Sequence, residues 1–336
     1  MLFGNSPSDF GMLPPQFTGD VQMFLPTGII PSATQNWQQW VKPRGTSMVY
    51  MICIGGGGGG GGGRTGATNT ARGGGGAGGT SAFTAVMIPA ILLPDVLKIS
   101  VGTGGQGGTA NTVGIIGETS YISTGTGLTA GTAIPNMILR AGGGALGNPG
   151  LTTGGGAGGG SAAATTIAQL GPLGKLGFFS NTGTATNAGY AGIAGSNGGQ
   201  QTGAIGQSLT QQWRTIPLTG GTGGAGISAQ VNGFTGGVLN LQNFVDFADG
   251  TFTPPSSFLP GGLGGTSGLN GGNGDAGVKS LKPFFNTGGT GGGSSQLAGG
   301  QGGNGGYGCG GGGGGAGNPA GRGGNGGPGL IIITSW

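Results

Sequence analysis

An unbroken run of nine glycines, residues 55–63, constrains the fold of this chain more than any other feature. Glycine loses more backbone freedom on folding than any other residue and brings no side chain to bury. A run of this length can be ordered only by backbone hydrogen bonds and by chains that pack closer than a Cβ atom would allow. A second run, residues 310–315, makes the same demand near the other end of the chain.

The composition favours an ordered structure built from this glycine. Glycine supplies 96 of the 336 residues, only 11 residues are basic and 7 acidic, and 34% are hydrophobic. Disordered chains combine low hydrophobicity with high net charge, and this chain lacks the charge. Collagen needs glycine at every third position, and neither glycine run sits in a sustained Gly-X-Y register. We therefore expect extended segments that hydrogen-bond laterally, with either polyglycine II-like or tight β geometry.

Short β-like segments frame the glycine-rich part. Residues 47–54 are rich in strand formers and apolar on both faces, which predicts a strand covered from both sides. Residues 329–336 predict a second strand, and we expect the two to pair and close the body. Shorter strands are predicted at 82–88, 96–101, 119–123 and 136–140, and no stretch shows a helical period. The sequence thus predicts an all-β, sandwich-like body with almost no helix.

Residues 1–36 differ from the glycine-rich β body at 37–336. Prolines at high density in this segment rule out a helix and predict an extended arm. One interpretation is that the arm lays its aromatic rings on a neighbouring subunit, and the other is that it wraps over its own domain. The aromatic residues proposed as assembly anchors are Phe3, Phe10, Phe17, Phe24 and Trp37.

The sequence argues against an enzyme. It contains no histidine, the side chain that most often performs acid–base catalysis at neutral pH. Asp246 and Asp249 are better explained as a solvated turn than as an acid pair or a calcium loop, because calcium needs 6–8 oxygen ligands. Lys175 follows a glycine, but Leu176 stands where a phosphate loop needs a hydroxyl. We expect no catalytic residues, no metal site and no cofactor.

Charge and hydropathy limit the classes of partner. The basic residues are scattered and form no stripe, so nucleic-acid binding is not expected. The first basic residue is Lys42, so the chain lacks the charged beginning of a signal peptide. The longest glycine-free apolar stretch, residues 81–94, is interrupted by prolines and shorter than the about 20 residues of a membrane helix. We expect neither a signal peptide nor membrane insertion.

Two further sets of residues are candidates for specific roles. Cys53 and Cys309 each lie beside one of the two longest glycine runs, so they either form a disulfide or are two small buried apolar side chains, which we favour. Aromatic and arginine residues dominate binding hot spots. Those that interrupt the glycine-rich body are candidate receptor contacts: Phe178, Phe179, Trp213, Arg214, Phe244, Phe247, Phe284 and Phe285.

Three segments of the body resemble a known family. Trp40-Val-Lys-Pro-Arg-Gly45, followed by a strand and a glycine run, resembles the beginning of the glycine-rich domains of bacteriophage tail-fibre and adhesin proteins. Residues 323–336 are similar to the closing strand of those domains, and residues 96–108 to their middle segment. The resemblance covers residues 37–336. It implies a virion structural protein in which a hydrogen-bonded glycine sandwich holds variable loops out to a host receptor.

The resemblance also implies a location and partners. We expect a protein of the virion surface, extracellular, that forms a homo-oligomer, a trimer if it is a fibre, and contacts other virion proteins through the arm. Domains of this type usually end a long fibre, whereas about 36 residues precede the body here. A capsid or neck decoration protein without a receptor therefore stays an alternative, as does a self-assembling cell-surface filament subunit that uses the arm.

Overall fold

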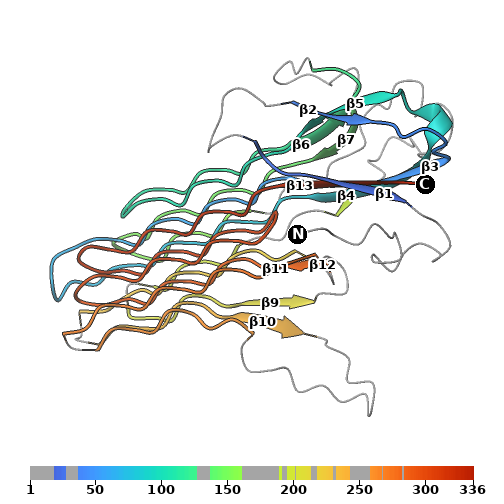
Figure 1. Cartoon of the computed structure of the whole chain (residues 1–336). Helices are drawn as coiled ribbons and strands as arrows, with labels where there is room; N and C mark the ends of the chain where they lie inside the picture. The colour runs from blue at the N-terminus through green and yellow to red at the C-terminus, as the bar shows by residue number, and fades with distance from the viewer. Residues whose placement is uncertain are drawn as a thin grey trace, which may run out of the picture.

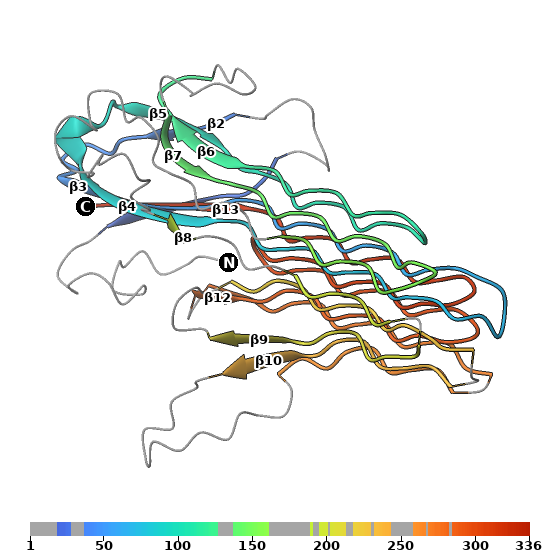
Figure 2. The ribbon, with the colours of Figure 1, turned by 180° about the vertical axis from the view of Figure 1, so that it is seen from behind.

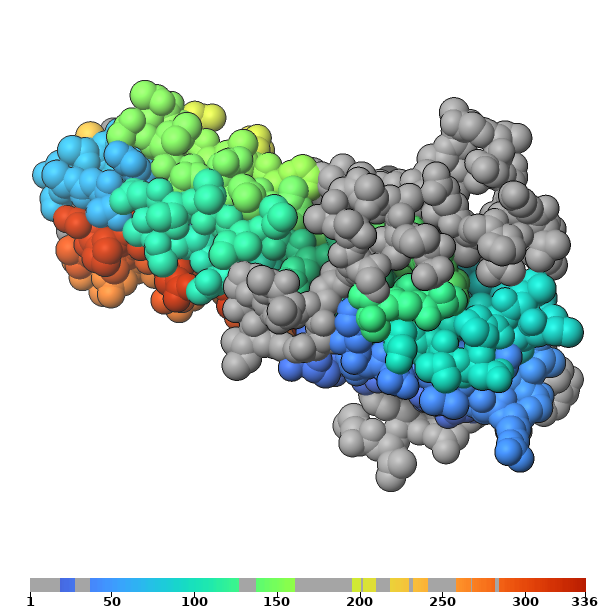
Figure 3. Space-filling model, turned by 90° about the horizontal axis from the view of Figure 1, so that it is seen from above, coloured from blue at the N-terminus to red at the C-terminus, as the bar shows by residue number. Residues whose placement is uncertain are grey.

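The molecule is elongated, with β-sheets at one end and a stack of glycine-rich segments at the other (Figure 1, Figure 3). In this computed structural model the described residues are 19–27, 37–126, 137–160, 189–190, 195–200, 202–212, 218–229, 232–242, 258–266, 268–281 and 284–336. The described part is almost entirely β or extended, and its helical content is one 3-10 turn, η2 (Ala90–Leu92). The predicted all-β class is confirmed.

The larger sheet joins the two ends of the glycine-rich body. Its strands are β1 (Asp20–Phe24), β3 (Met48–Ile54), β4 (Phe83–Pro89), β8 (Gly189–Tyr190) and β13 (Leu330–Ser335), in the order β1-β13-β3-β4-β8. β13 lies antiparallel to β3, with Leu330 opposite Ile54 and Ser335 opposite Val49. The predicted pairing of the strands at 47–54 and 329–336 is therefore confirmed.

A second sheet completes the sandwich. It contains β2 (Gln38–Val41), β5 (Val96–Ser100), β6 (Ser120–Ser123) and β7 (Met137–Ala141) in the order β2-β5-β6-β7. Trp40, Leu97 and Ile122 of this sheet pack with Met51 and Ile333 of the larger sheet in one buried cluster. The four shorter strands predicted between the two glycine runs thus appear as β4, β5, β6 and β7.

The outer face of the larger sheet is also covered. Ile52, Ile54 and Ile332 form a second buried cluster, against which Phe284 and Tyr307 pack. Phe284 belongs to a hairpin of β11 (Lys279–Leu281) and β12 (Phe284–Asn286), while β9 (Leu209–Gln212) and β10 (Leu239–Gln242) form a separate parallel pair. The prediction that residues 47–54 are covered on both faces is correct.

The strands continue as undulating glycine-rich rows that run side by side and together form the glycine lattice (Figure 1, Figure 2). The rows are joined by backbone hydrogen bonds between segments far apart in sequence. They comprise residues 55–64, 73–80, 102–109, 112–118, 142–151, 154–160, 195–200, 204–207, 219–227, 233–238, 259–266, 269–278, 286–296, 298–306, 308–317 and 320–329.

The hydrogen bonds of row 55–64 repeat every three residues. Its N–H groups donate to three antiparallel rows in turn: those of 56, 59 and 62 to row 112–118, those of 57, 60 and 63 to row 320–329, and those of 58, 61 and 64 to row 73–80. Its carbonyls accept from three parallel rows, 142–151, 102–109 and 308–317, with the same period. Six neighbours therefore surround one row.

This pattern settles the backbone geometry. A strand alternates between two sides, whereas a period of three is that of the polyproline II conformation, with three residues per turn. Among the described glycines only Gly45, Gly203, Gly268 and Gly308 have positive φ, and of these only Gly308, at the start of row 308–317, belongs to a row. The other described row glycines have the negative φ of that left-handed helix. The rows form a polyglycine II lattice, and the tight β alternative is wrong.

Close packing explains why the rows are made of glycine. A Cβ atom on Gly58 would lie 2.6 Å from the carbonyl carbon of Ala145, and one on Gly60 would lie 2.7 Å from that of Gly312. Both distances are below 3.0 Å, which real Cβ contacts essentially never show. At the periphery, row 112–118 keeps glycine only at 114 and 117, while Val113 and Ile116 are exposed. Glycine content thus falls from the centre of the lattice outward.

Short polar side chains take the place of glycine where they can hydrogen-bond a neighbouring row. The hydroxyls of Thr219 and Thr222 accept from the N–H groups of Gly288 and Gly291, at 2.8 and 2.9 Å. The Oδ1 atom of Asn325 accepts from the N–H of Gly107 at 2.9 Å. Buried amides of the lattice are therefore satisfied even where a neighbour presents no carbonyl.

Part of the predicted arm belongs to the body. Residues 20–24 form β1, an edge strand antiparallel to β13, and the side chain of Phe24 is buried in the core of its own chain. The prediction of Phe24 as an anchor on a neighbour is wrong, because strand pairing places this ring inside the sandwich. Trp37 is partly exposed. Phe3, Phe10 and Phe17 lie outside the described residues.

Candidate interaction surface at the turn end of the glycine lattice

The rows of the lattice run alternately away from the sheets and back, so the connections between successive rows meet at one end. Row 55–64 leaves β3, reverses, and returns as row 73–80 to β4; row 308–317 reverses into row 320–329, which leads to β13. We call the far end the turn end; Figures 1 and 2 show it opposite the strands. The described residues of its connections are 64–73, 109–112, 151–154, 200 and 202–204, 227–229 and 232–233, 266 and 268–269, 296–298, and 317–320.

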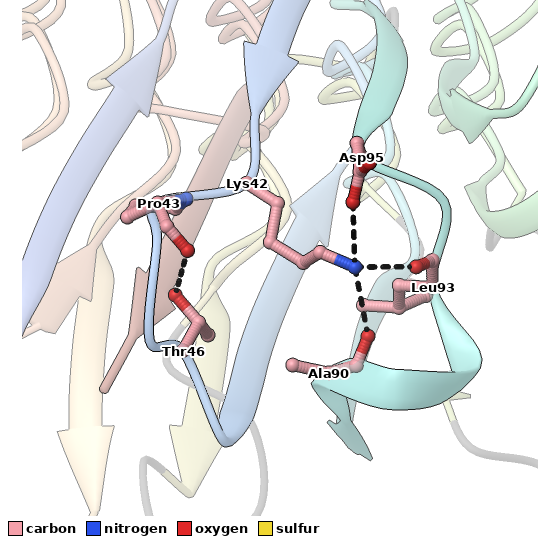
Figure 4. A network of polar contacts seen from close by, with 6 residues as sticks. All are labelled: Lys42, Pro43, Thr46, Ala90, Leu93 and Asp95. Atoms are coloured by element: carbon pink, nitrogen blue, oxygen red, sulfur yellow. Dashed lines mark hydrogen bonds and ion pairs between the residues drawn. The ribbon is translucent and has the colours of Figure 1, made fainter.

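The opposite end, which we call the sheet end, is closed by specific polar contacts. The ammonium group of Lys42 donates to the carbonyls of Ala90 and Leu93 at 3.2 and 2.8 Å and lies 3.0 Å from a carboxylate oxygen of Asp95 (Figure 4). These contacts hold η2 against β2. The carbonyl of Trp336 accepts from the N–H of Ser47 at 2.7 Å, which fixes the end of β13.

The surface of the turn end is polar but poor in charge. Residues 67–71, which read Ala-Thr-Asn-Thr-Ala, are exposed, as are Thr152 and Thr153. Exposed apolar side chains stand among them at Leu151, Leu269 and Leu297. Hydroxyl, amide and isolated aliphatic groups on turns held by a rigid scaffold are typical of a recognition surface.

A buried arginine organises this end. Arg72 is 1% exposed, and its guanidinium donates to the carbonyls of Thr70, Gly66 and Gly317 at 3.1, 2.6 and 2.9 Å and to Oε1 of Gln296 at 2.7 Å. Burial lowers its pKa. The four acceptors come from three different connections, so this one side chain ties 64–73 to 296–298 and 317–320.

Two more arginines flank the same connections. Arg64 ends the central row, and its carbonyl accepts from the N–H of Gly317. Its Nε atom is buried without an acceptor among the described residues. Arg322 follows the connection 317–320 and is exposed. These arginines were not predicted as site residues, because their proximity depends on which rows are neighbours. Their positions near the ends of glycine-rich segments were the only sequence feature that could have indicated them.

The predicted receptor contacts are not brought together. Phe284 packs against the larger sheet, with its ring centroid 6.4 Å from that of Phe83, and it is partly buried there. Its role as a receptor contact stays a prediction. The rings of Phe285 and Phe258 meet edge to face, with 5.9 Å between their centroids. Phe178, Phe179, Trp213, Arg214, Phe244 and Phe247 lie outside the described residues.

The two cysteines are free and buried. Cys53 belongs to the core between the two sheets, whereas Cys309 belongs to the cluster on the other face of the larger sheet. A disulfide between them is ruled out because the sheet separates them, and the alternative of two small buried apolar side chains is correct. Burial raises the pKa of both thiols, that of Cys309 to about 12.

These thiols make stability depend on pH. Above their usual pKa of 9.0, the unfolded chain releases two protons that the folded chain retains, so the free energy of unfolding falls as pH rises. The stability is fully present below pH 9. Above it the slope approaches about 2.7 kcal/mol per pH unit, at 1.36 for each thiol. Denaturant unfolding from pH 8 to 10.5 measures it, and Cys53→Ala should halve the slope; an unchanged slope in Cys53→Ala/Cys309→Ala contradicts this prediction.

Searches for related proteins identify no family for this chain: no family model matches it, and no curated protein matches its sequence. Among the described residues, no three His, Cys, Asp or Glu side chains gather to hold a metal ion. In the same part of the chain, no helix is long and apolar enough to cross a membrane.

Proposed function

We propose that this chain is a structural protein of a bacteriophage virion, a surface-exposed fibre or adhesin whose turn end presents its connections to a host receptor. The observation that carries this proposal is that the two ends of the glycine lattice differ. The connections between rows meet at one end, and the two packed sheets form the other. Segments scattered over the whole chain are thereby gathered into one exposed surface.

The lattice suits a presenting role because it is stiff without side chains. Each interior row is hydrogen-bonded to six neighbours, so a connection at the turn end cannot move without breaking bonds in several rows. A row of ten residues spans about 31 Å at 3.1 Å per residue, which holds the connections well away from the sheets. Recognition residues on a rigid support lose little entropy on binding.

The direction of β1 supports attachment at the sheet end. Asp20 lies opposite Ser335, so β1 begins beside the end of β13, at the end of the body opposite the connections. An arm that contacts other virion proteins from there leaves the turn end facing outward. We extend the proposal to a homo-oligomer, a trimer in the case of a fibre.

Location tests the proposal. A peptide tag inserted after Thr68, in an exposed connection, is compared with the same tag inserted after Arg44, in an exposed turn of the sheet end. Antibody labelling in electron micrographs should place both tags at the tip of a tail fibre, with the Thr68 tag farther out, and antibody to the Thr68 tag should block adsorption. Label on the shell would favour a decoration protein. Label on periodic filaments without nucleic acid would favour the filament subunit.

A further inference from the structure

Three arginines lie in or next to the connections of the turn end. The N–H of Gly63 donates to the carbonyl of Gly321 at 2.9 Å, which places row 55–64, ending in Arg64, beside the row that carries Arg322. Arg72 reaches the same place, because its guanidinium donates to the carbonyl of Gly317 at 2.9 Å. Arg64 and Arg72 thus lie at the two ends of connection 64–73, and Arg322 lies two residues beyond connection 317–320.

No carboxylate lies in the described residues of the connections themselves. The described carboxylates are Asp20 and Asp95 at the sheet end, Glu118 where row 112–118 meets β6, and Asp275 within row 269–278. Asp275 and Arg322 lie in rows that both border row 298–306: the N–H of Gly274 donates to the carbonyl of Gln301, and the N–H of Gly302 to the carbonyl of Arg322, both at 2.8 Å. Among the described residues no ion pair joins Asp275 to Arg322. The undescribed residues of the connections, Gln201, Gln230, Val231 and Ser267, are uncharged by sequence.

The three arginines have different roles. Arg72 uses four hydrogen bonds within the protein, so it contributes positive charge to the site and makes no contact with a ligand. Arg322 is exposed, and no acceptor for its guanidinium is found among the described residues. Arg64 is half-buried with an unpaired Nε donor. A planar guanidinium with free N–H donors can donate two parallel hydrogen bonds to the oxygens of a phosphate or carboxylate.

We infer that the turn end binds the anionic groups, phosphate or carboxylate, of a bacterial surface polysaccharide, with Arg64 and Arg322 as the contacts. The inference rests on the proposed function for the source of the ligand. The exposed hydroxyl and amide groups of residues 68–70, 152 and 153 supply neutral partners for sugar hydroxyls around the charged centre. A polysaccharide fits this mixture of few cations and many neutral polar groups better than a nucleic acid, which needs a stripe of positive charge.

Substituted dextrans test the inference on the full chain. Binding to phosphorylated dextran and to carboxymethyl dextran is measured by biolayer interferometry against unsubstituted dextran of the same length. The expected result is binding to both charged dextrans with little binding to the neutral one. Arg322→Gln should weaken binding about tenfold. It should also make the salt dependence of the affinity shallower, by the amount that corresponds to about one lost ionic contact. Arg64→Gln should act in the same direction.

Arg44→Gln is the matched control, because Arg44 is exposed at the sheet end and the charge change is identical. It should alter affinity less than twofold. If it weakens binding as much as Arg322→Gln, attraction to net charge explains the result and the inference is wrong. Equal binding to neutral dextran also overturns it. Preference for phosphatidylglycerol vesicles over the charged dextrans would show a membrane surface as the source of the anion and contradict the polysaccharide.

The two proposals fail separately. If antibody at the turn end blocks adsorption but the Arg322→Gln variant binds charged dextran like the unaltered protein, the anion site is wrong and the receptor-binding role stands. If the labels place this protein away from the host-facing end but Arg322→Gln still weakens binding to charged dextran, the anion site stands and the proposed function is wrong.

Discussion

Replacing Gly58 with alanine is expected to destabilise the protein strongly, whereas the same replacement at Gly160 leaves its stability nearly unchanged. Gly58 lies in the central row, and the new Cβ atom would lie 2.6 Å from the carbonyl carbon of Ala145 and 3.0 Å from the carbonyl oxygen of Gly144. Both atoms belong to backbone, so no side chain can rotate away. Overpacking typically costs about 1–3 kcal/mol, and we expect at least the upper end of this range because a whole row must move.

Gly160 is the matched control at the edge of the same lattice. A Cβ atom there meets no atom of the described residues within 4 Å, and the residue does not have the positive φ that would make alanine strained. Alanine at Gly160 should leave the free energy of unfolding unchanged or raise it by about 0.4–1 kcal/mol, because it restricts the unfolded chain. Denaturant unfolding of the soluble variants measures both. Equal stability of the two variants would contradict the close-packing account of this fold.

The sheets were predictable because their strands carry ordinary signals. Residues 47–54 and 330–335 are dense in β-branched and large apolar residues. Because the strands are buried on both faces, they show a continuous apolar run and no alternation of apolar and polar residues. Their position next to the glycine runs then indicated how the body closes. Pairing of β13 with β3 follows from these two facts.

The geometry of the lattice was harder to predict, because a glycine run carries no side-chain pattern. The period of three appears only in the residues that interrupt glycine. Thr219 and Thr222 are separated by two glycines, and so are Thr287 and Thr290; each hydroxyl accepts an N–H from an adjacent row. The repeat Thr-Gly-Gly-Thr is therefore the sequence signal for polyglycine II geometry, and it does not require the sustained Gly-X-Y register of collagen.

The candidate site could be predicted least. Aromatic residues are common in binding hot spots and were therefore predicted as receptor contacts. In a chain with few aromatic residues, however, Phe284 packs against a buried cluster. The arginines of the turn end are far apart in sequence, and only the order of rows brings Arg64 beside the row of Arg322. That order depends on hydrogen bonds between near-identical glycine segments, whose partners no residue pattern distinguishes.

Replacing Arg72 with methionine is expected to destabilise the turn end by about 2–4 kcal/mol. Methionine is similar in length but has no donor, so the carbonyls of Gly66, Thr70 and Gly317 and Oε1 of Gln296 lose their partner. Leaving buried acceptors unsatisfied costs about 1–3 kcal/mol each, less where water can enter. Hydrogen exchange of the amides in 64–73 and 317–320 should accelerate before those of β3 and β13, because the loss is local.

Arg322→Met separates this structural role from charge. The substitution removes the same positive charge at the same end, but Arg322 is exposed and supports no connection, so the free energy of unfolding should change by less than about 0.5 kcal/mol. Arg72→Lys keeps the charge, yet one ammonium group cannot replace a fork that reaches four acceptors, so it should lose most of the stability that methionine loses. If Arg72→Lys is as stable as the unaltered protein, charge rather than the hydrogen-bonded fork holds the connections together.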